Sequence, residues 1–170
     1  IDGTFTPNTS LVVFNGGDQS ISAASFNILQ LSGSGTKSLV GNVSFDQKIT
    51  VDANINFDLN VNTLSGTTAT DTLQLSSGDS LLIGGSSPTG IETFTPAIGS
   101  VVVYDGGSQT IASTTYHHLV LRGTGTKTLG GAVTINGDLS VETNLKFDLL
   151  TLTLTGSGFS NTLTLSSGDS

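Results

Sequence analysis

The chain repeats itself at a spacing of 90 residues, and this internal duplication constrains its fold more than any other feature. Residues 11–80 aligned on residues 101–170 without a gap give 31 identities in 70 positions, about 44%. Three strings recur at this offset: VFNGGDQSI as VYDGGSQTI, GSGTKSL as GTGTKTL, and TLQLSSGDS as TLTLSSGDS. Self-similarity at a fixed period is typical of repeat architectures, so one structural unit is expected to occur twice.

The duplication divides the chain into copy one, residues 1–90, and copy two, residues 91–170. The string TFTP returns at an offset of 89, which places a one-residue insertion between Pro96 and Val101. Copy two ends at SSGDS, where copy one continues into LLIGG. We therefore expect copy two to be truncated, to be continuous with copy one, and to belong to a longer array.

Within each copy, apolar residues alternate with polar ones, as at Ile55, Phe57 and Leu59 and again at Leu145, Phe147 and Leu149. This period of two predicts strands with one buried and one solvent-facing side, and helical spacing is not sustained anywhere. Glycine, asparagine and aspartate interrupt the strands every six to ten residues. These residues favour turns, so the chain is expected to be all-β.

Two all-β architectures fit a 90-residue unit. The favoured one is a parallel β-solenoid, or β-helix, in which four coils of about 22 residues make one unit. The alternative is a pair of tandem immunoglobulin-like sandwiches, although the chain has neither the tryptophan nor the cysteine pair of typical members. The predicted core comprises Val12, Leu29, Leu31, Val43, Val51, Phe57 and Leu73, with their counterparts Val102, Leu119, Leu121, Val133, Val141, Phe147 and Leu163.

The solenoid makes specific expectations about neighbours. Parallel strands should pair at a separation of about 20–24 residues, since adjacent strands lie ~4.8 Å apart. The turns that contain Lys37 and Lys127 should lie on one edge of the rod, four coils apart.

Composition limits the partners and the chemistry. Five basic residues against 13 acidic ones, a net charge of −8, disfavour nucleic acid and anionic membranes, which bind clustered Lys or Arg. The absence of cysteine excludes a disulfide scaffold and a cysteine nucleophile. No apolar run approaches the ~20 residues of a transmembrane helix. Abundant Thr, Ser, Asn and Gly favour an extracellular location.

Several motifs have a functional and a structural interpretation. GSGTKS and GTGTKT depart from the phosphate-loop pattern, because threonine separates glycine from Lys37 and Lys127 and no helix follows. His117 and His118 are adjacent, and neighbouring strand residues point to opposite faces, so a metal site is not expected there. Both motifs are interpreted as structural.

The acidic residues are interpreted as structural too. The acids shared by the copies are Asp52/Glu142, Asp58/Asp148 and Asp79/Asp169. Each pair lies one unit apart, roughly 19 Å over four coils of ~4.8 Å, too far to act on one glycosidic bond. No catalytic residue is therefore assigned, and an enzyme is not expected.

Calcium is the ion that best suits the SSGDS and NGGD turns, because loop oxygens are its preferred ligands. The dense nonapeptide of calcium β-rolls is absent, however, and solvated turn acids are the favoured interpretation. We therefore expect no cofactor and assign no metal ligand.

Threonines at 151, 153, 155, 162 and 164 are similar to the threonine ladders of ice-binding solenoids. Copy one breaks this ladder with Val61, Ser65 and Gln74. Ordinary outward β-branched packing is therefore favoured over ice binding.

The strings GSGTKSLVGNVSF and GTGTKTLGGAVTING, each following a strand, resemble repeats of giant secreted bacterial adhesins and filament proteins, including type IX-secreted ones. The resemblance covers nearly all of the chain and implies structural or adhesive work at the cell surface. It transfers no catalytic residue. The expected function is a structural segment of an extracellular fibre, stalk or filament. The alternative is a module that binds glycans or a partner surface, and the expected partners are neighbouring repeats and laterally bundled rods.

Overall fold

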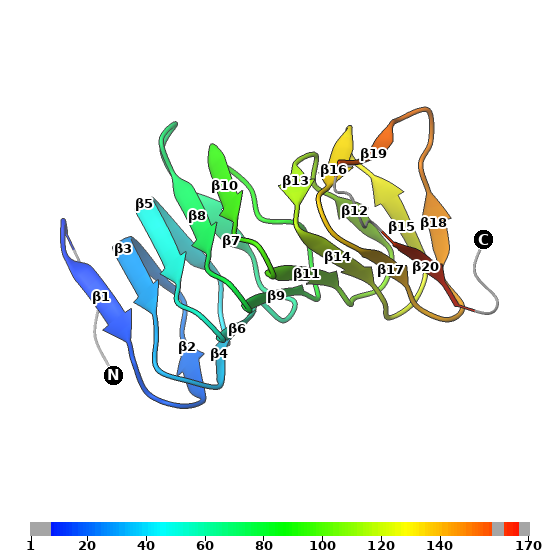
Figure 1. The fold of residues 1–170 in the computed structure, drawn as a ribbon. Helices are drawn as coiled ribbons and strands as arrows, with labels where there is room; N and C mark the ends of the chain where they lie inside the picture. The colour runs from blue at the N-terminus through cyan, green and yellow to red at the C-terminus, as the bar shows by residue number, and fades with distance from the viewer. Residues whose placement is uncertain (1–7, 158–161, 167–170) are drawn as a thin grey trace.

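The chain is an all-β parallel solenoid, as expected. The computed structural model describes residues 8–157 and 162–166, and this part of the chain contains twenty strands and no helix. Every strand pairing is parallel. The strands stack from β1 at one end to β20 at the other (Figure 1). The sandwich alternative is therefore wrong.

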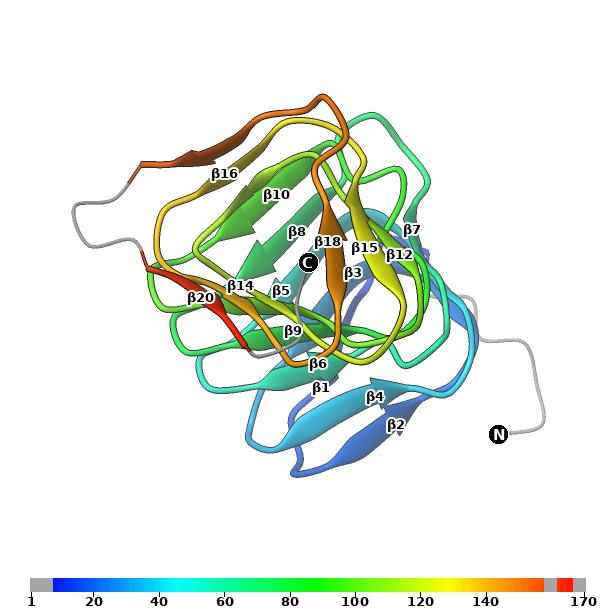
Figure 2. The same cartoon turned by 90° about the vertical axis from the view of Figure 1, so that its right-hand side faces the viewer.

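The coil has three faces, which are visible along the axis of the stack (Figure 2). Face B is one uninterrupted eight-stranded sheet: β2 (Gln19–Ile21), β4 (Thr36–Leu39), β6 (Asn56–Asp58), β9 (Ser80–Ile83), β11 (Val101–Tyr104), β14 (His118–Leu121), β17 (Leu139–Val141) and β20 (Leu163–Leu165). Each turn of the coil contributes one strand to this sheet, so the described residues make about eight turns.

Faces A and C are each built from two stacks of strands. Face A contains β1 (Leu11–Phe14), the second parts of β3 (Ala24–Leu31) and β5 (Val43–Val51), β8 (Thr72–Leu75) and β10 (Thr93–Pro96), followed by β13 (Thr115–Tyr116), β16 (Val133–Ile135) and β19 (Leu154–Gly156). Face C contains the first parts of β3 and β5, β7 (Leu64–Gly66), the bridge from Ser65 to Thr89, and then β12 (Gln109–Ile111), β15 (Thr126–Leu129) and β18 (Lys146–Asp148).

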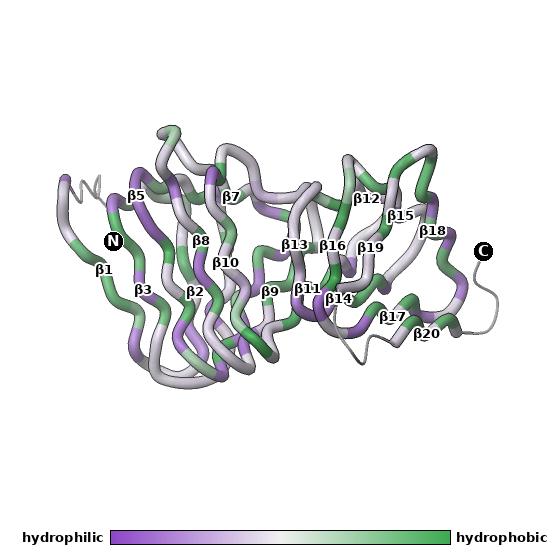
Figure 3. Tube along the Cα trace, turned by 45° about the horizontal axis from the view of Figure 1, so that its top comes forward, coloured by the Kyte–Doolittle hydropathy of each residue, from purple (hydrophilic) through white to green (hydrophobic). Residues whose placement is uncertain are grey.

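The coils pair at separations close to those expected. Along face A, the successive partners are Val12, Leu29, Ile49, Leu73 and Phe94, so all but the first of these coils have a length in the expected range. Hydrophobic and hydrophilic positions alternate along the trace from the first coils to the last (Figure 3). The inward side chains make one core that runs through both copies, because buried residues from each belong to the same cluster.

The predicted core is largely correct. Eleven of its fourteen residues are at most 1% exposed. Val12 and Phe147 are partly buried, and Leu163 is 58% exposed. Val12 and Leu163 lie on the first and last strands of their sheets among the residues that the structure describes.

The two copies share strand positions but are turned relative to one another. β1, β2, β4, β6 and β7 recur as β11, β12, β15, β18 and β19 with both bounds shifted by 90. β1 lies on face A, however, whereas β11 lies on face B between β9 and β14. Each unit therefore advances by four turns and one further face.

Coil length explains this rotation. Four turns on face A lead from Val12 to Phe94, and four turns on face B lead from Gln19 to Val102. Both spans are shorter than the repeated unit, by eight residues on face A and by seven on face B. These seven or eight additional residues take the chain around one corner of the coil, so the next unit begins on the following face. The expectation that a unit equals four coils is therefore wrong.

Candidate functional site

The two lysines of the glycine-rich strings point into the core and reach the corners of the coil. The Nζ atom of Lys37, on β4, donates to the carbonyl oxygens of Gly16 at 2.7 Å, Ser34 at 2.9 Å and Gly17. The Lys37 side chain is fully buried. Burial lowers its pKa, and the carboxylate of Asp18 opposes this shift. The ammonium joins the corners of two successive coils.

Lys127 is bound in the same way in copy two. Its Nζ donates to the carbonyl oxygens of Gly106 at 2.8 Å and Gly107 at 2.7 Å, and to Oε1 of Gln109 at 2.7 Å. Burial lowers the pKa of Lys127, and nearby Asp105 opposes the shift. Neither lysine faces solvent, so the structural interpretation of the glycine strings agrees with this geometry.

The lysines also show the rotation between the copies. Lys37 pairs with Gln19 on face B, whereas Lys127 pairs with Gln109 on face C. The prediction that their turns share one edge of the rod is therefore wrong. The extra face in each 90-residue unit moves equivalent residues to the next side of the coil.

The buried acids bind backbone amides. Asp79 accepts hydrogen bonds from the Ile55 amide at 3.1 Å and the Ser76 amide at 2.6 Å. Burial raises its pKa to about 6. Asp71 accepts from the Thr68 amide at 2.8 Å and from the Thr67 amide and the Thr68 hydroxyl. These acids satisfy the donors of their own turns and of the preceding coil.

The acid pairs noted in the sequence are not brought together. Asp58 lies on β6 of face B and Asp148 on β18 of face C. Asp52 follows a face A strand, whereas Glu142 follows a face B strand. Asp169 lies outside the described residues. Within the part of the chain that the structure describes, no group of three or more His, Cys, Asp or Glu could hold a metal ion.

The two histidines lie closer than expected. Their ring centroids are 4.3 Å apart, so the prediction that they point to opposite faces is wrong. His117 precedes β14 and is outside any strand, and strand alternation does not apply to it. Nδ1 of His117 accepts from the Gly99 amide at 3.2 Å, and Nδ1 of His118 accepts from the Asp138 amide at 3.0 Å. Burial is the main cause that lowers the pKa of His117.

The threonines of the proposed ladder do not share a surface. Thr151 and Thr153 lie outside the strands, Thr155 is on β19 of face A, and Thr164 is on β20 of face B. The outward row of face B instead changes from polar to aliphatic and back, from Ser38 and Asp58 to Leu82, Val103 and Val120, and then to Ser140.

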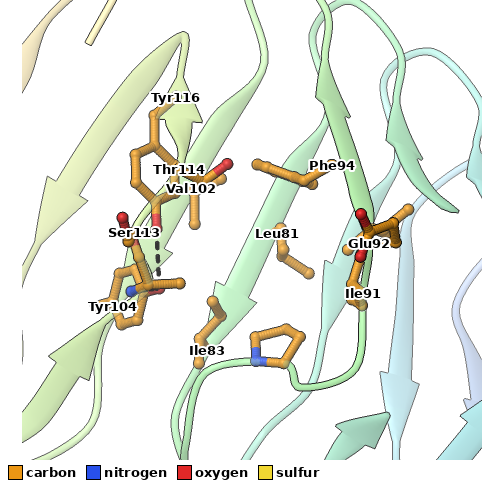
Figure 4. A pocket seen from close by; sticks show the side chains of 13 residues that line it. Leu81, Ile83, Ile91, Glu92, Phe94, Val102, Tyr104, Ser113, Thr114 and Tyr116 are labelled. Atoms are coloured by element: carbon orange, nitrogen blue, oxygen red, sulfur yellow. Dashed lines mark hydrogen bonds between the residues drawn. The ribbon is translucent and has the colours of Figure 1, made fainter. Parts of the chain in front are cut away.

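The junction between the copies contains the most unusual site. A cavity of about 170 Å³ lies where the last coil of copy one meets the first coil of copy two. Copy one contributes aliphatic side chains, among them Leu81 and Ile83, and copy two contributes the aromatic side chains of Phe94, Tyr104 and Tyr116 (Figure 4). Face B continues across this junction, whereas faces A and C each divide into separate sheets there.

The two tyrosines make a polar contact inside this apolar junction. Their hydroxyl groups are 3.1 Å apart, and both side chains are 1% exposed. The Ala112 amide donates to the Tyr104 hydroxyl at 3.1 Å, and the Tyr116 hydroxyl donates to the Ala112 carbonyl at 2.9 Å. The Ser87 hydroxyl lies 3.1 Å from that of Tyr104, which links copy one to the pair. Burial strongly raises the pKa of Tyr116.

The junction was missed by sequence reasoning, although one signal pointed to it. Tyr104 and Tyr116 replace Phe14 and Phe26 of copy one, a paired exchange that adds two hydroxyls at equivalent positions. The sequence alone does not show that the two positions meet.

Comparisons with known proteins give no relative. No protein-family model, no curated protein and no solved structure matches the chain. No helix among the described residues is long and apolar enough to span a membrane.

Proposed function

We propose that this chain is a structural segment of an extracellular repetitive fibre, stalk or filament that mediates attachment or contact at a cell surface. One observation carries the proposal: face B continues as a single sheet from copy one into copy two. In tandem domains joined by linkers, each unit bends independently of the next. A backbone ladder that crosses the junction instead resists bending, so further copies would lengthen a stiff rod.

The dimensions of the rod follow from the coil. Each 90-residue unit advances four and one-third turns, which at ~4.8 Å per turn is about 21 Å. Three units make thirteen turns, about 62 Å, and restore the original orientation of each face. Any surface feature of one unit would therefore appear on all three sides of a long array, which suits a fibre that meets its neighbours from every direction.

The buried polar groups support mechanical work. Lys37, Lys127, Asp71 and Asp79 each join turns or satisfy turn amides, and all four are fully buried. Their hydrogen bonds are made to groups of the solenoid itself.

A glycan- or partner-binding module is the second candidate. It is supported by the outward row of face A, where Gln30, Thr50, Gln74 and Thr95 lie on successive coils. Such a row repeats polar side chains at the strand spacing of ~4.8 Å. A glycan array probed with the purified chain tests this candidate directly, and binding that is lost in Gln74→Ala but not in Ser140→Ala would favour it.

Localisation and length together test the main proposal. Antibodies against the purified chain should label intact cells of the source organism without permeabilisation. Each 90-residue unit added to the gene should lengthen the fibres by about 21 Å, which is the rise of one unit at the strand spacing. Electron microscopy measures this length. Label that appears only after cell lysis, or fibre length that is independent of copy number, would contradict the proposal.

A further inference from the structure

The two adjacent histidines of copy two bind backbone amides of the coils on either side. Nδ1 of His117 accepts a hydrogen bond from the Gly99 amide, at 3.2 Å, on the preceding coil. Nδ1 of His118 accepts one from the Asp138 amide, at 3.0 Å, on the following coil. The two side chains therefore connect three successive coils.

Both imidazole rings must be neutral to make these hydrogen bonds. A ring nitrogen that accepts from an amide N–H carries no proton, so each neutral ring has its proton on Nε2. A second proton would bind at Nδ1 and turn the acceptor into a donor that faces another donor. The ring centroids of His117 and His118 are 4.3 Å apart, so two charged rings would also repel each other.

Protonation affects the two bonds differently. Nδ1 of His118 lies 3.5 Å from Oδ2 of Asp138, so a protonated His118 can donate to this carboxylate and remain bound to the following coil. The Thr162 amide donates to Oδ1 of the same carboxylate at 3.1 Å and holds it in place. The partner of His117 is the Gly99 amide, which offers no acceptor to a protonated ring. The His117 bond is therefore the one that a proton breaks.

The His117 bond lies where the two copies meet. His117 directly follows β13, and Gly99 lies in the turn between β10 and β11. β10 is the last strand of one sheet and β13 the first strand of another, so no strand pairing joins them. One residue further on, the His118 amide donates to the Ser100 carbonyl at 3.1 Å. Loss of the His117 bond would free the turn before β11 and leave the pairing on face B intact.

We propose that His117 and His118 form a proton-sensitive link between the two copies. While both rings are neutral, the turn at Gly99 is held against the end of β13. Acidification protonates His117 and releases this turn, whereas His118 transfers its bond to the Asp138 carboxylate and keeps the following coil in place. The junction between the copies is therefore more mobile in acid than at neutral pH. This property belongs to the folded chain and does not depend on the proposed fibre function.

The neighbours of His117 determine the pH at which the link opens. Burial, and then the charge of His118, lower the pKa of His117, and the charge of Asp138 opposes them. The folded protein thus favours the neutral ring. The contribution of His117 to stability is present above pH 6.5 and is lost as the pH falls through the lowered pKa.

Two further acids lie on the coils packed against the pair. The turn at Gly99 lies over the turn that contains Asp79, and burial raises the pKa of Asp79 to about 6. Glu92 is exposed and lines the junction cavity together with Tyr116. Both acids are retained in a variant that lacks only His117, so comparison with that variant removes their contribution to any pH dependence.

Hydrogen exchange at the Gly99 amide, measured by NMR on the 170-residue chain, tests the link. Exchange rates are converted to protection factors, which removes the intrinsic effect of pH on exchange. Between pH 7.5 and pH 5 the protection factor of Gly99 should fall on the order of tenfold, because a released turn opens more often. The Arg122 amide, which binds the Tyr104 carbonyl between the same two coils at 2.9 Å, should keep its protection.

Matched variants identify the group that titrates. Asparagine is the residue of copy one at this position, Asn27, and His117→Asn keeps an acceptor close to the place of Nδ1 without titrating. In this variant Gly99 should be equally protected at both pH values. His118→Asn should move the midpoint of the change to higher pH and Asp138→Asn to lower pH, since their charges act on His117 in opposite directions.

Two results would overturn the inference. One is a protection factor of Gly99 that is the same at both pH values in the parent, and the other is an equal fall in His117→Asn. Nitrogen NMR of the two rings gives an independent measurement, because both should carry their proton on Nε2 above pH 6.5, and a proton on Nδ1 of His117 would contradict the link. Surface localisation and fibre length would still decide the proposed function separately.

Discussion

Replacing Lys127 by methionine should destabilise the solenoid by about 2–4 kcal/mol, a net value for the loss of charge-assisted hydrogen bonds less the cost of desolvating the ammonium. The Nζ atom of Lys127 donates three hydrogen bonds of 2.7–2.8 Å, and the Lys127 side chain is fully buried. Bonds to a charged donor contribute roughly 1.5–3 kcal/mol each before desolvation is counted. Methionine keeps the apolar stem and fills a similar volume, so packing changes little.

Not every acceptor is left unpaired in the Lys127→Met variant. The Gly106 carbonyl still accepts from the Thr124 amide at 3.1 Å, and Oε1 of Gln109 still accepts from the Gly106 amide at 3.0 Å. The Gly107 carbonyl loses the donor that it has now. The expected loss therefore lies below the sum of three charged bonds.

Urea unfolding at neutral pH, followed by circular dichroism, measures this change. Lys37→Met should cost a similar amount, because its ammonium also binds three carbonyl oxygens. Lys146→Met is the matched control: its side chain is 58% exposed and its ion pair with Asp148 is on the surface, so it should cost at most about 1 kcal/mol. A Lys127→Met variant as stable as the parent would show that desolvation outweighs the three bonds, and the role of the lysine as a link between coils would be refuted.

Three further predictions concern the buried acid, the tyrosine pair and metal ions. Burial raises the pKa of Asp79 to about 6, so its contribution to stability is complete below pH 3.8 and is lost as the pH rises through 6. Relative to Asp79→Asn, the parent should therefore lose roughly 2 kcal/mol of unfolding free energy between pH 4 and 7, as measured by urea titration. Equal pH profiles for the two proteins would contradict this. Burial raises the pKa of Tyr116, so the contribution of this phenol to stability is present below pH 10 and lost above it. In the Tyr104→Phe variant, the phenolate absorbance at 295 nm should rise only as the far-ultraviolet circular dichroism of the fold disappears. Phenolate formation in folded protein would refute the burial of Tyr116. Chelation with EDTA should leave the melting temperature unchanged, because the buried carboxylates of Asp71 and Asp79 bind backbone amides; a fall of many degrees would show structural ions in the acidic turns.

Much of the fold could be predicted from the sequence because the residue type at each position indicates whether that position is buried, exposed or in a turn. Alternation at Ile49, Val51, Ile55, Phe57 and Leu59 predicted burial, and all five side chains are fully buried. Glycines in the strings GSG and GTG predicted turns, and Gly33 and Gly35 have φ values of +85° and +73°, which favour glycine. Local pattern therefore sufficed for the strands and corners.

The rotation between the copies could not be predicted in the same way. It depends on the lengths of individual coils, which differ along the chain, from the short step between Val12 and Leu29 to the long step between Ile49 and Leu73. An average coil length hides the surplus of seven or eight residues that turns each unit.

The interior position of Lys37 was missed for a related reason. Lysine is rarely fully buried, and only the stacked carbonyls of Gly16, Gly17 and Ser34 make its burial favourable. These carbonyls belong to two successive coils, so their meeting point depends on the stacking and not on the local pattern.

The central claim is that 90-residue units stack as one parallel coil and that each unit is turned by one face. Engineered disulfides test it directly, since the chain has no cysteine of its own. Val103 lies opposite Leu82 of β9 on face B, whereas Gln74 of β8 lies on face A. Partners on adjacent strands fall within the Cα separation that a disulfide spans, about 4.4–6.8 Å.

Three double-cysteine variants make the comparison, with disulfide formation under mild oxidation measured by mass spectrometry. Val120→Cys with Ser140→Cys, a pair within copy two, is the positive control. Leu82→Cys with Val103→Cys should form a disulfide as readily, and Gln74→Cys with Val103→Cys should form none. Efficient linkage of residues 74 and 103 without linkage of 82 and 103 would place β11 on face A, and the rotated continuous solenoid would be wrong.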